Sequence, residues 1–66
     1  MTTITVIAYA HPSATDEQVR DLLWTKAAEA AARSGRVPDA MTAHDARETD
    51  DGFVEHRALF TMKEAR

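Results

Sequence analysis

The 66-residue sequence contains no cysteine, so it can form neither a disulfide nor a thiolate metal site. Glycine is also scarce. With only two glycines there is no glycine-rich phosphate loop, and the G-x-S-x-G nucleophile motif is absent. No segment approaches the ~20 apolar residues of a transmembrane helix, and none has the pattern of a secretion signal. We therefore expect a cytoplasmic protein, not an enzyme, with no cofactor, metal site or membrane association.

Large apolar side chains are few. The hydrophobic fraction is 44%, but it includes thirteen alanines, which bury little area. A domain of this length buries only ~60% of the surface that its unfolded chain exposes, so its stability is marginal. Small domains without disulfides or metals often gain stability by associating. The composition therefore predicts a single domain that forms a homo-oligomer.

A basic stripe is also missing. The formal net charge is −3 and the isoelectric point about 5.4. Four basic residues lie along or just beyond the expected helix: Arg20, Lys26, Arg33 and Arg36. Asp21 and Glu29 interrupt them, whereas nucleic-acid binding needs clustered cations to neutralise phosphates. The charge pattern therefore argues against nucleic acid as a partner.

Residues 2–10, TTITVIAYA, are rich in β-branched side chains and predict a strand. Both faces of this strand carry apolar residues, so we expect both to be covered at least in part. Pro12 ends the strand, because proline cannot donate a hydrogen bond to a neighbouring strand.

A helix is predicted from Thr15 to Ser34. Thr15 and Gln18 match the S/T-x-x-E/Q capping box, and Gly35 is placed to end the helix in the left-handed conformation. Counting 100° per residue defines the expected core face, with Leu22 at its edge. That face consists of Val19, Leu23, Ala27, Ala30 and Ser34.

Residues 40–48 and 53–62 are predicted to form a β-hairpin around an Asp-Gly turn at residues 49–52. Residues 35–39 are expected to be a connector, and residues 63–66 a frayed tail. The alternation of apolar and polar residues is weak in the first of these two strands. A helix is the alternative there, because the segment is rich in alanine.

This order of elements predicts one α+β domain over residues 1–66, a βαββ chain with a three-stranded antiparallel sheet and one amphipathic helix on one face. The first strand could pair with the second or the third. Pairing with the third would place the most apolar strands side by side. The other sheet face is then mixed, with Ile7, Tyr9, Phe53 and Leu59 among Thr42, His44, Glu55 and Arg57.

Trp24 lies about 100° from the centre of the helix core face, beside Ala28 and Ala31. It could cap the edge of the core, contact a partner as tryptophan does in interface hot spots, or stack on a ligand. We expect two association surfaces. Their residues are Trp24, Ala28 and Ala31 on the helix, and Tyr9, Phe53 and Leu59 on the sheet.

The three histidines, His11, His44 and His56, match no compact metal motif. His56 lies on the apolar face of its strand, where we expect a hydrogen bond to satisfy it. A four-residue hairpin loop would place Asp45 opposite His56, whereas a two-residue turn would place Arg47 there. A metal or acid–base role for the histidines is the alternative.

Four acidic residues surround the predicted turn: Glu48, Asp50, Asp51 and Glu55. They lack the regular oxygen spacing of an EF-hand loop. We expect a solvated turn. The alternative is an acidic surface that meets a basic partner.

The order of elements, the length and the DDGFVEH hairpin resemble the dodecins, small flavin-binding proteins that assemble into hollow dodecamers. The resemblance covers nearly the whole chain and implies a flavin-binding or small-molecule-binding oligomer. Dodecins usually place a flavin-stacking tryptophan at the start of the second strand. Here that region reads PDAMTAHD, and AHPSAT replaces the glycine and serine pattern after the first strand. No flavin-binding residue is carried over by a matching motif.

These features together predict a non-catalytic, oligomerising interaction module. It would be an accessory or regulatory protein, of the kind that phages and other mobile elements encode to bind a host protein. The alternatives are a dodecin-like carrier of flavin or another small molecule, and a nucleic-acid-associated regulator.

Overall fold

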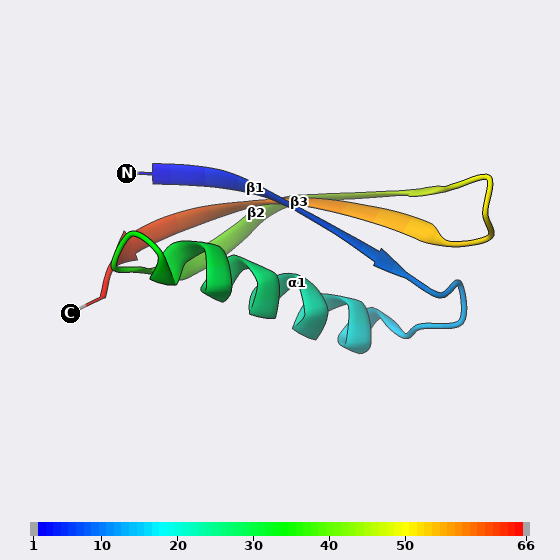
Figure 1. Ribbon diagram of the computed structural model, residues 1–66, viewed down its shortest axis with the longest axis horizontal. Helices are drawn as coiled ribbons and strands as arrows, with labels where there is room; N and C mark the ends of the chain where they lie inside the picture. Colours follow the sequence, from blue (N-terminus) through cyan, green and yellow to red (C-terminus); the bar gives the residue numbers. More distant parts are fainter. Residues whose placement is uncertain (1, 66) are drawn as a thin grey trace.

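The computed structural model describes residues 2–65 and contains a strand, a helix and two further strands (Figure 1). These elements are β1 (Thr2–Ala10), α1 (Asp16–Ala32), β2 (Arg36–Glu48) and β3 (Val54–Glu64). The strands form one antiparallel sheet in the order β1-β3-β2, and α1 packs on one of its faces. The predicted α+β class is confirmed. The first strand pairs with the third, and residues 40–48 form a strand rather than a helix.

Helix α1 begins where the capping box predicts. The Gln18 backbone N–H donates to Thr15 Oγ1 over 3.1 Å, and the Thr15 backbone N–H donates to the Gln18 side-chain oxygen over 3.0 Å. The helix ends at Ala32, earlier than the predicted Ser34, and Gly35 adopts the expected left-handed backbone with φ of 69°. Across residues 2–65, no helix combines the length and the apolar character needed to cross a membrane.

The buried stripe of α1 differs in part from the predicted core face. It consists of Val19, Leu23, Ala27 and Ala31. These residues form an i, i+4 row, which is inclined to the helix axis, so the helix crosses the strands obliquely. The placement of Ala30 and Ser34 in the core was wrong, because both are exposed. Counting angles around the axis assumes a face parallel to it and therefore misses this inclination.

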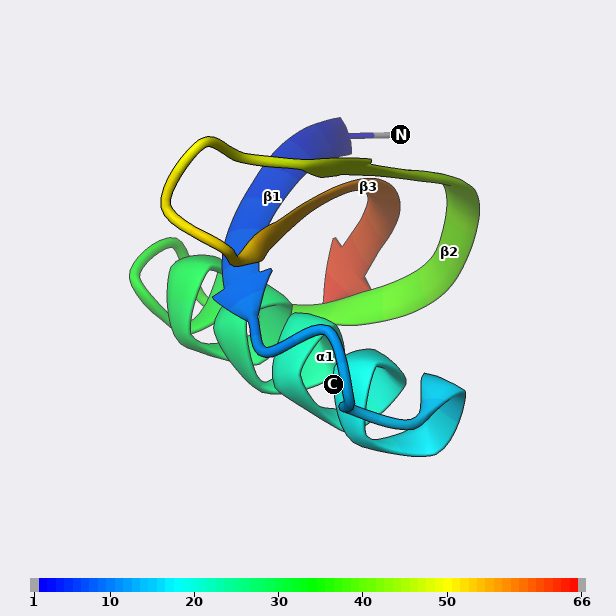
Figure 2. The same ribbon diagram turned by 90° about the vertical axis from the view of Figure 1, so that its right-hand side faces the viewer.

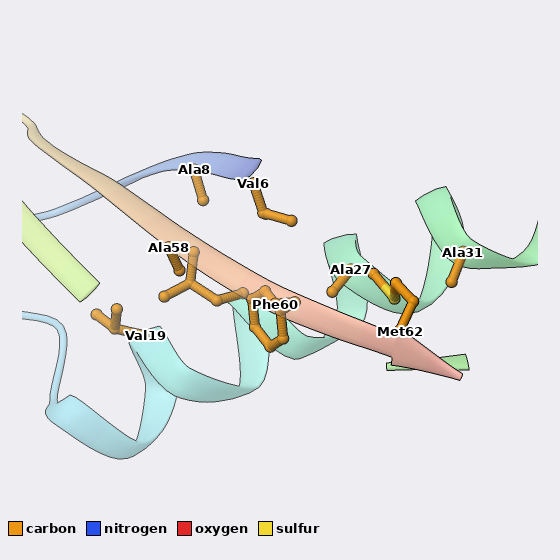
Figure 3. Packing of buried hydrophobic residues seen from close by; sticks show 9 residues of the cluster. Val6, Ala8, Val19, Ala27, Ala31, Ala58, Phe60 and Met62 are labelled. Atoms are coloured by element: carbon orange, nitrogen blue, oxygen red, sulfur yellow. The ribbon is translucent and has the colours of Figure 1, made fainter. Parts of the chain in front are cut away.

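The core is small and rich in alanine (Figure 3). Phe60 and Leu23 are its largest fully buried side chains. Four of the nine buried apolar residues in the described chain are alanines: Ala8, Ala27, Ala31 and Ala58. Trp24 covers the edge of this core, where its ring meets the ring of Phe60 edge to face with centroids 4.9 Å apart. Short side chains on both α1 and the sheet leave little apolar volume between the two layers.

Strand β2 begins at Arg36, so the predicted connector at residues 35–39 is largely strand. Pro38 is tolerated because β2 lies at the edge of the sheet, and the register shifts between Pro38 and Ala40. A second shift lies between Met41 and Ala43. Such bulges bend a strand, and Figure 2 shows β2 curving strongly along its length.

The β2–β3 connection spans residues 49–53, because Glu48 pairs with Val54. It is longer than either predicted turn. The Thr49 backbone N–H donates to the Phe53 carbonyl over 2.9 Å and closes the loop, while Gly52 supplies a positive φ of 88°. The loop length fixes the register and places Ala46, rather than Asp45 or Arg47, opposite His56.

The tail predicted to be frayed is ordered as strand through Glu64. The early start of β2 explains this difference, because Val37 pairs with Lys63 and Arg36 with Glu64. The Ala65 backbone N–H also donates to the Gly35 carbonyl over 3.2 Å. Residue 66 lies outside the described residues.

The molecule is elongated, measuring 39 × 18 × 16 Å, and the hairpin projects beyond the helix at one end (Figure 1). Its radius of gyration is 12.3 Å, against about 11 Å for a compact domain of this length. Its accessible surface is 4729 Å², against about 4,200 Å² for a monomeric protein of 7.3 kDa. The isolated chain therefore exposes about 500 Å² more surface than a typical monomer of its mass.

Candidate functional site

The sheet face opposite α1, which we call the open face, is not covered by any element of residues 2–65. The exposed large apolar side chains of the described chain are Ile7, Tyr9, Val37, Phe53 and Leu59. Strand pairing places four of them on the open face, and Phe53 lies in the hairpin loop. Tyr9 is 60% exposed and Phe53 44%. These two aromatic residues, with Thr49 and Asp51, line a surface hollow of about 500 Å³.

The predicted helix surface does not form a continuous patch. Ala31 is only 3% exposed and belongs to the core, so its assignment to an association surface was wrong. The inclined buried row of α1 is the physical reason. Ala28 is exposed, whereas Trp24 is half-buried against Phe60. Of the two predicted surfaces, only the sheet surface brings its large residues to one side of the molecule.

Glu55 is a buried carboxylate on the open face, not part of a solvated turn as predicted. Arg47 Nε donates to its Oε1 over 2.7 Å, and the Tyr9 hydroxyl donates to its Oε2 over 3.4 Å. The guanidinium of Arg57 lies 3.9 Å from the same Oε2. The hydrogen bond from Arg47 lowers the pKa of Glu55, and the charges of Arg47 and Arg57 act in the same direction.

The pairing of Glu55 follows from register, since Tyr9 and Arg47 lie directly opposite it on the two neighbouring strands. Sequence reasoning missed this set because the hairpin register depends on the loop length. Asp45, Ala46, Arg47, Glu55 and Arg57 line a surface depression of about 220 Å³. The carboxylate of Glu55 at the centre of the open face is thus already paired with two arginines of the same chain.

His44 and His56 meet on the opposite face, the one that α1 covers. His44 was expected on the open face, but the bulge between Met41 and Ala43 reverses the alternation of β2 at this point. His44 Nε2 lies 3.0 Å from His56 Nδ1, and the ring centroids are 5.2 Å apart. His56 therefore hydrogen-bonds to His44 instead of the expected Asp45.

His56 is 9% exposed, whereas His44 is on the surface. Burial lowers the pKa of His56, the charge of His44 lowers it further, and the Asp16 carboxylate opposes both effects. The pair borders a surface depression of about 240 Å³. This depression is lined by Asp16, Val19, Arg20, Met41, His44 and His56.

His11 lies apart from this pair, in the turn after β1. Its Nδ1 is 2.7 Å from Ser13 Oγ and accepts the Ser13 backbone N–H over 3.1 Å. Within residues 2–65, no three His, Cys, Asp or Glu side chains are grouped so that they could hold a metal ion. The three histidines thus do not form a single site.

The open face and the histidine pair are the two candidate sites, and they lie on opposite sides of the sheet. The first offers exposed apolar surface around paired charges, and the second offers two neighbouring imidazole nitrogens. Comparison with known proteins found no match to a protein family, to a curated protein or to a solved structure.

Proposed function

We propose that the chain is a non-catalytic cytoplasmic module that acts by association, and that it forms a homo-oligomer through its open face. The observation that carries this proposal is the group of exposed large apolar residues on one side of the sheet: Ile7, Tyr9, Val37 and Leu59, with Phe53 in the adjoining loop. Large apolar side chains that are exposed together on one side of a protein are a feature of interaction surfaces. The proposal also includes a role as an accessory or regulatory protein that binds another protein.

The surface area supports a second copy as the occupant. The chain exposes about 500 Å² more than expected for a monomer, and a standard interface buries about 800 Å² per partner. Two open faces packed against each other would form a β-sandwich with the helices outside, and sheets stack in this way at about 10 Å separation. The small alanine-rich core supplies a reason for association, because it gives the isolated chain little apolar burial.

The ion pairs of the open face are compatible with being covered. A buried carboxylate without a partner is costly, but Glu55 already has Arg47, Arg57 and Tyr9 around it. Covering the face would therefore leave Glu55 with its partners. Both copies would present the same surface, as a two-fold symmetric dimer requires.

Leu59→Lys tests this proposal by placing a charge in the open face. We expect wild type to have the mass of a dimer or larger oligomer by light scattering coupled to size exclusion, and Leu59→Lys to be a folded monomer. Ala28→Lys is the matched control, because it adds the same charge to an exposed position on α1. A monomeric wild type, or an oligomer that only Ala28→Lys disrupts, would contradict the proposal.

The hollow between Tyr9 and Phe53 supports a second candidate, an oligomer that carries flavin or another small flat molecule. Its volume of about 500 Å³ lies within the usual range of about 300–1,000 Å³ for ligand pockets. This candidate predicts a yellow preparation or quenching of added flavin fluorescence, and Phe53→Ala would abolish the quenching. Colourless protein that leaves flavin fluorescence unchanged would exclude flavin.

A further inference from the structure

The imidazoles of His44 and His56 face each other with two nitrogens at a separation that one metal ion could bridge. The facing nitrogens, His44 Nε2 and His56 Nδ1, are 3.0 Å apart. Two nitrogens bound to one metal ion at about 2.05 Å are about 2.9 Å apart at a 90° angle and about 3.3 Å apart at the tetrahedral angle. The observed separation lies within this range. We infer that these two residues bind a divalent transition-metal cation on the helix side of the sheet, and that Cu²⁺ binds most strongly.

The pair is positioned before any ion arrives. His56 is on the central strand β3 and is buried, and the bulge in β2 directs His44 toward it. Ligands held in place by the scaffold lose little conformational freedom on binding.

Binding requires a shift of tautomer and a rotation of the rings, because the facing nitrogens point at each other in the hydrogen-bonded pair. In the hydrogen-bonded pair, one facing nitrogen carries a proton and donates a hydrogen bond to the lone pair of the other. In the metal-bound pair, both facing nitrogens present lone pairs, and each ring keeps its proton on the other nitrogen. The number of protons on the two neutral rings stays the same, and the hydrogen bond is exchanged for two bonds to the ion.

The depression beside the pair leaves room for the rest of the coordination sphere. It has a volume of about 240 Å³, and Asp16 adds negative charge while Arg20 adds an opposing positive charge. Since no third His, Cys, Asp or Glu within residues 2–65 completes the group, water fills the remaining positions. Imidazole ligands favour Cu²⁺, Ni²⁺ and Zn²⁺, and affinity among divalent ions peaks at Cu²⁺. Ca²⁺ and Mg²⁺ prefer oxygen ligands and are excluded.

Calorimetric titration of the full chain without an affinity tag tests this inference, using Cu²⁺, Ni²⁺, Zn²⁺ and Mg²⁺ salts separately. We expect one ion per chain, tightest for Cu²⁺ and undetectable for Mg²⁺. His44→Ala should weaken Cu²⁺ and Ni²⁺ binding at least tenfold, since even loss of an outer-shell partner costs about 10–100-fold. His11→Ala is the matched control and should bind as wild type does.

Paramagnetic resonance of the Cu²⁺ complex gives a second readout that does not depend on affinity. Wild type should show coupling to two imidazole nitrogens, and His44→Ala to one. Because His44 is exposed, this variant should keep the circular dichroism spectrum of the folded chain. Unchanged affinity and spectrum in folded His44→Ala would overturn the inference, as would a loss of binding confined to His11→Ala. The pair would then be a hydrogen bond only.

Discussion

The two faces of the sheet use apolar residues in opposite ways. The face under α1 buries the small residues Val6, Ala8 and Ala58 beside Phe60 and Met62. The open face keeps Ile7, Tyr9 and Leu59 at least a third exposed. A monomer that optimised its own stability would place the bulky residues in its core, because buried area sets the hydrophobic stabilisation. This difference is the basis of the proposed association through the open face.

The sharpest test of this comparison replaces the phenylalanine buried under α1 and the phenylalanine in the loop beside the open face, one at a time. Phe60→Ala should lower the free energy of unfolding by about 3–5 kcal/mol, because it leaves a cavity at the centre of the core. Phe53→Ala should change the unfolding free energy of the monomer by about 0.5 kcal/mol or less, because its side chain is exposed. Urea denaturation followed by circular dichroism measures both free energies, with each substitution made in the Leu59→Lys variant that is expected to be monomeric. Equal losses would remove the distinction between the regions.

Trp24→Ala should have an intermediate effect of about 2 kcal/mol on unfolding, because its half-buried ring loses the edge-to-face contact with Phe60. The same variant should keep the oligomeric mass of wild type, which light scattering would check. Loss of association without loss of monomer stability would instead assign Trp24 to a partner contact.

Two alanines of α1, one buried and one exposed, extend the comparison to the helix. Ala31→Leu should cost about 1–2 kcal/mol, because the added methylenes have no space between α1 and the sheet. Ala28→Leu is the matched control on the exposed side and should be close to neutral. Thermal unfolding of the two variants measures the difference. A destabilising Ala28→Leu would show that the exposed side of α1 is also packed.

The smallest effect concerns the pH dependence contributed by Glu55. Its pKa in the folded state lies below the ordinary value of 4.5, because Arg47 stabilises the ionised form. The unfolded chain therefore takes up the proton first. The stabilisation is fully present above about pH 4.5 and is lost as the pH falls through the lowered pKa. Glu55→Gln should reduce the decrease in unfolding free energy between pH 6 and pH 3, measured by denaturation at a series of pH values. Glu48→Gln, at an exposed position, should leave that decrease unchanged.

The elements that depend on local chemistry could be predicted from the sequence. The capping box at Thr15 fixed the start of α1, and the β-branched run of residues 2–10 predicted β1 with its observed bounds. The order of elements was enough to predict the α+β class. Tyr9 and Leu59 could be assigned to the uncovered side because strict alternation holds in β1 and β3.

The parts that depend on strand pairing could not be predicted in the same way. Two bulges interrupt the alternation of side chains between the two faces of β2. The face occupied by residues before a bulge therefore does not predict the face occupied by residues after it. His44 was misplaced for this reason. The partners of Glu55 and His56 depend on a five-residue connection, whereas the Asp-Gly dipeptide favoured a shorter turn.

The central position of β3 has a consequence for how the chain folds during synthesis. Neither β1 nor β2 pairs with the other, and both pair only with β3, which follows them in the sequence. While the ribosome is still adding residues 54–64, α1 is the only element that can form its own hydrogen bonds. Domains often fold from the amino end as they emerge, but this sheet cannot assemble until β3 is available to pair. A truncation within β3 therefore removes the partner of both other strands at once.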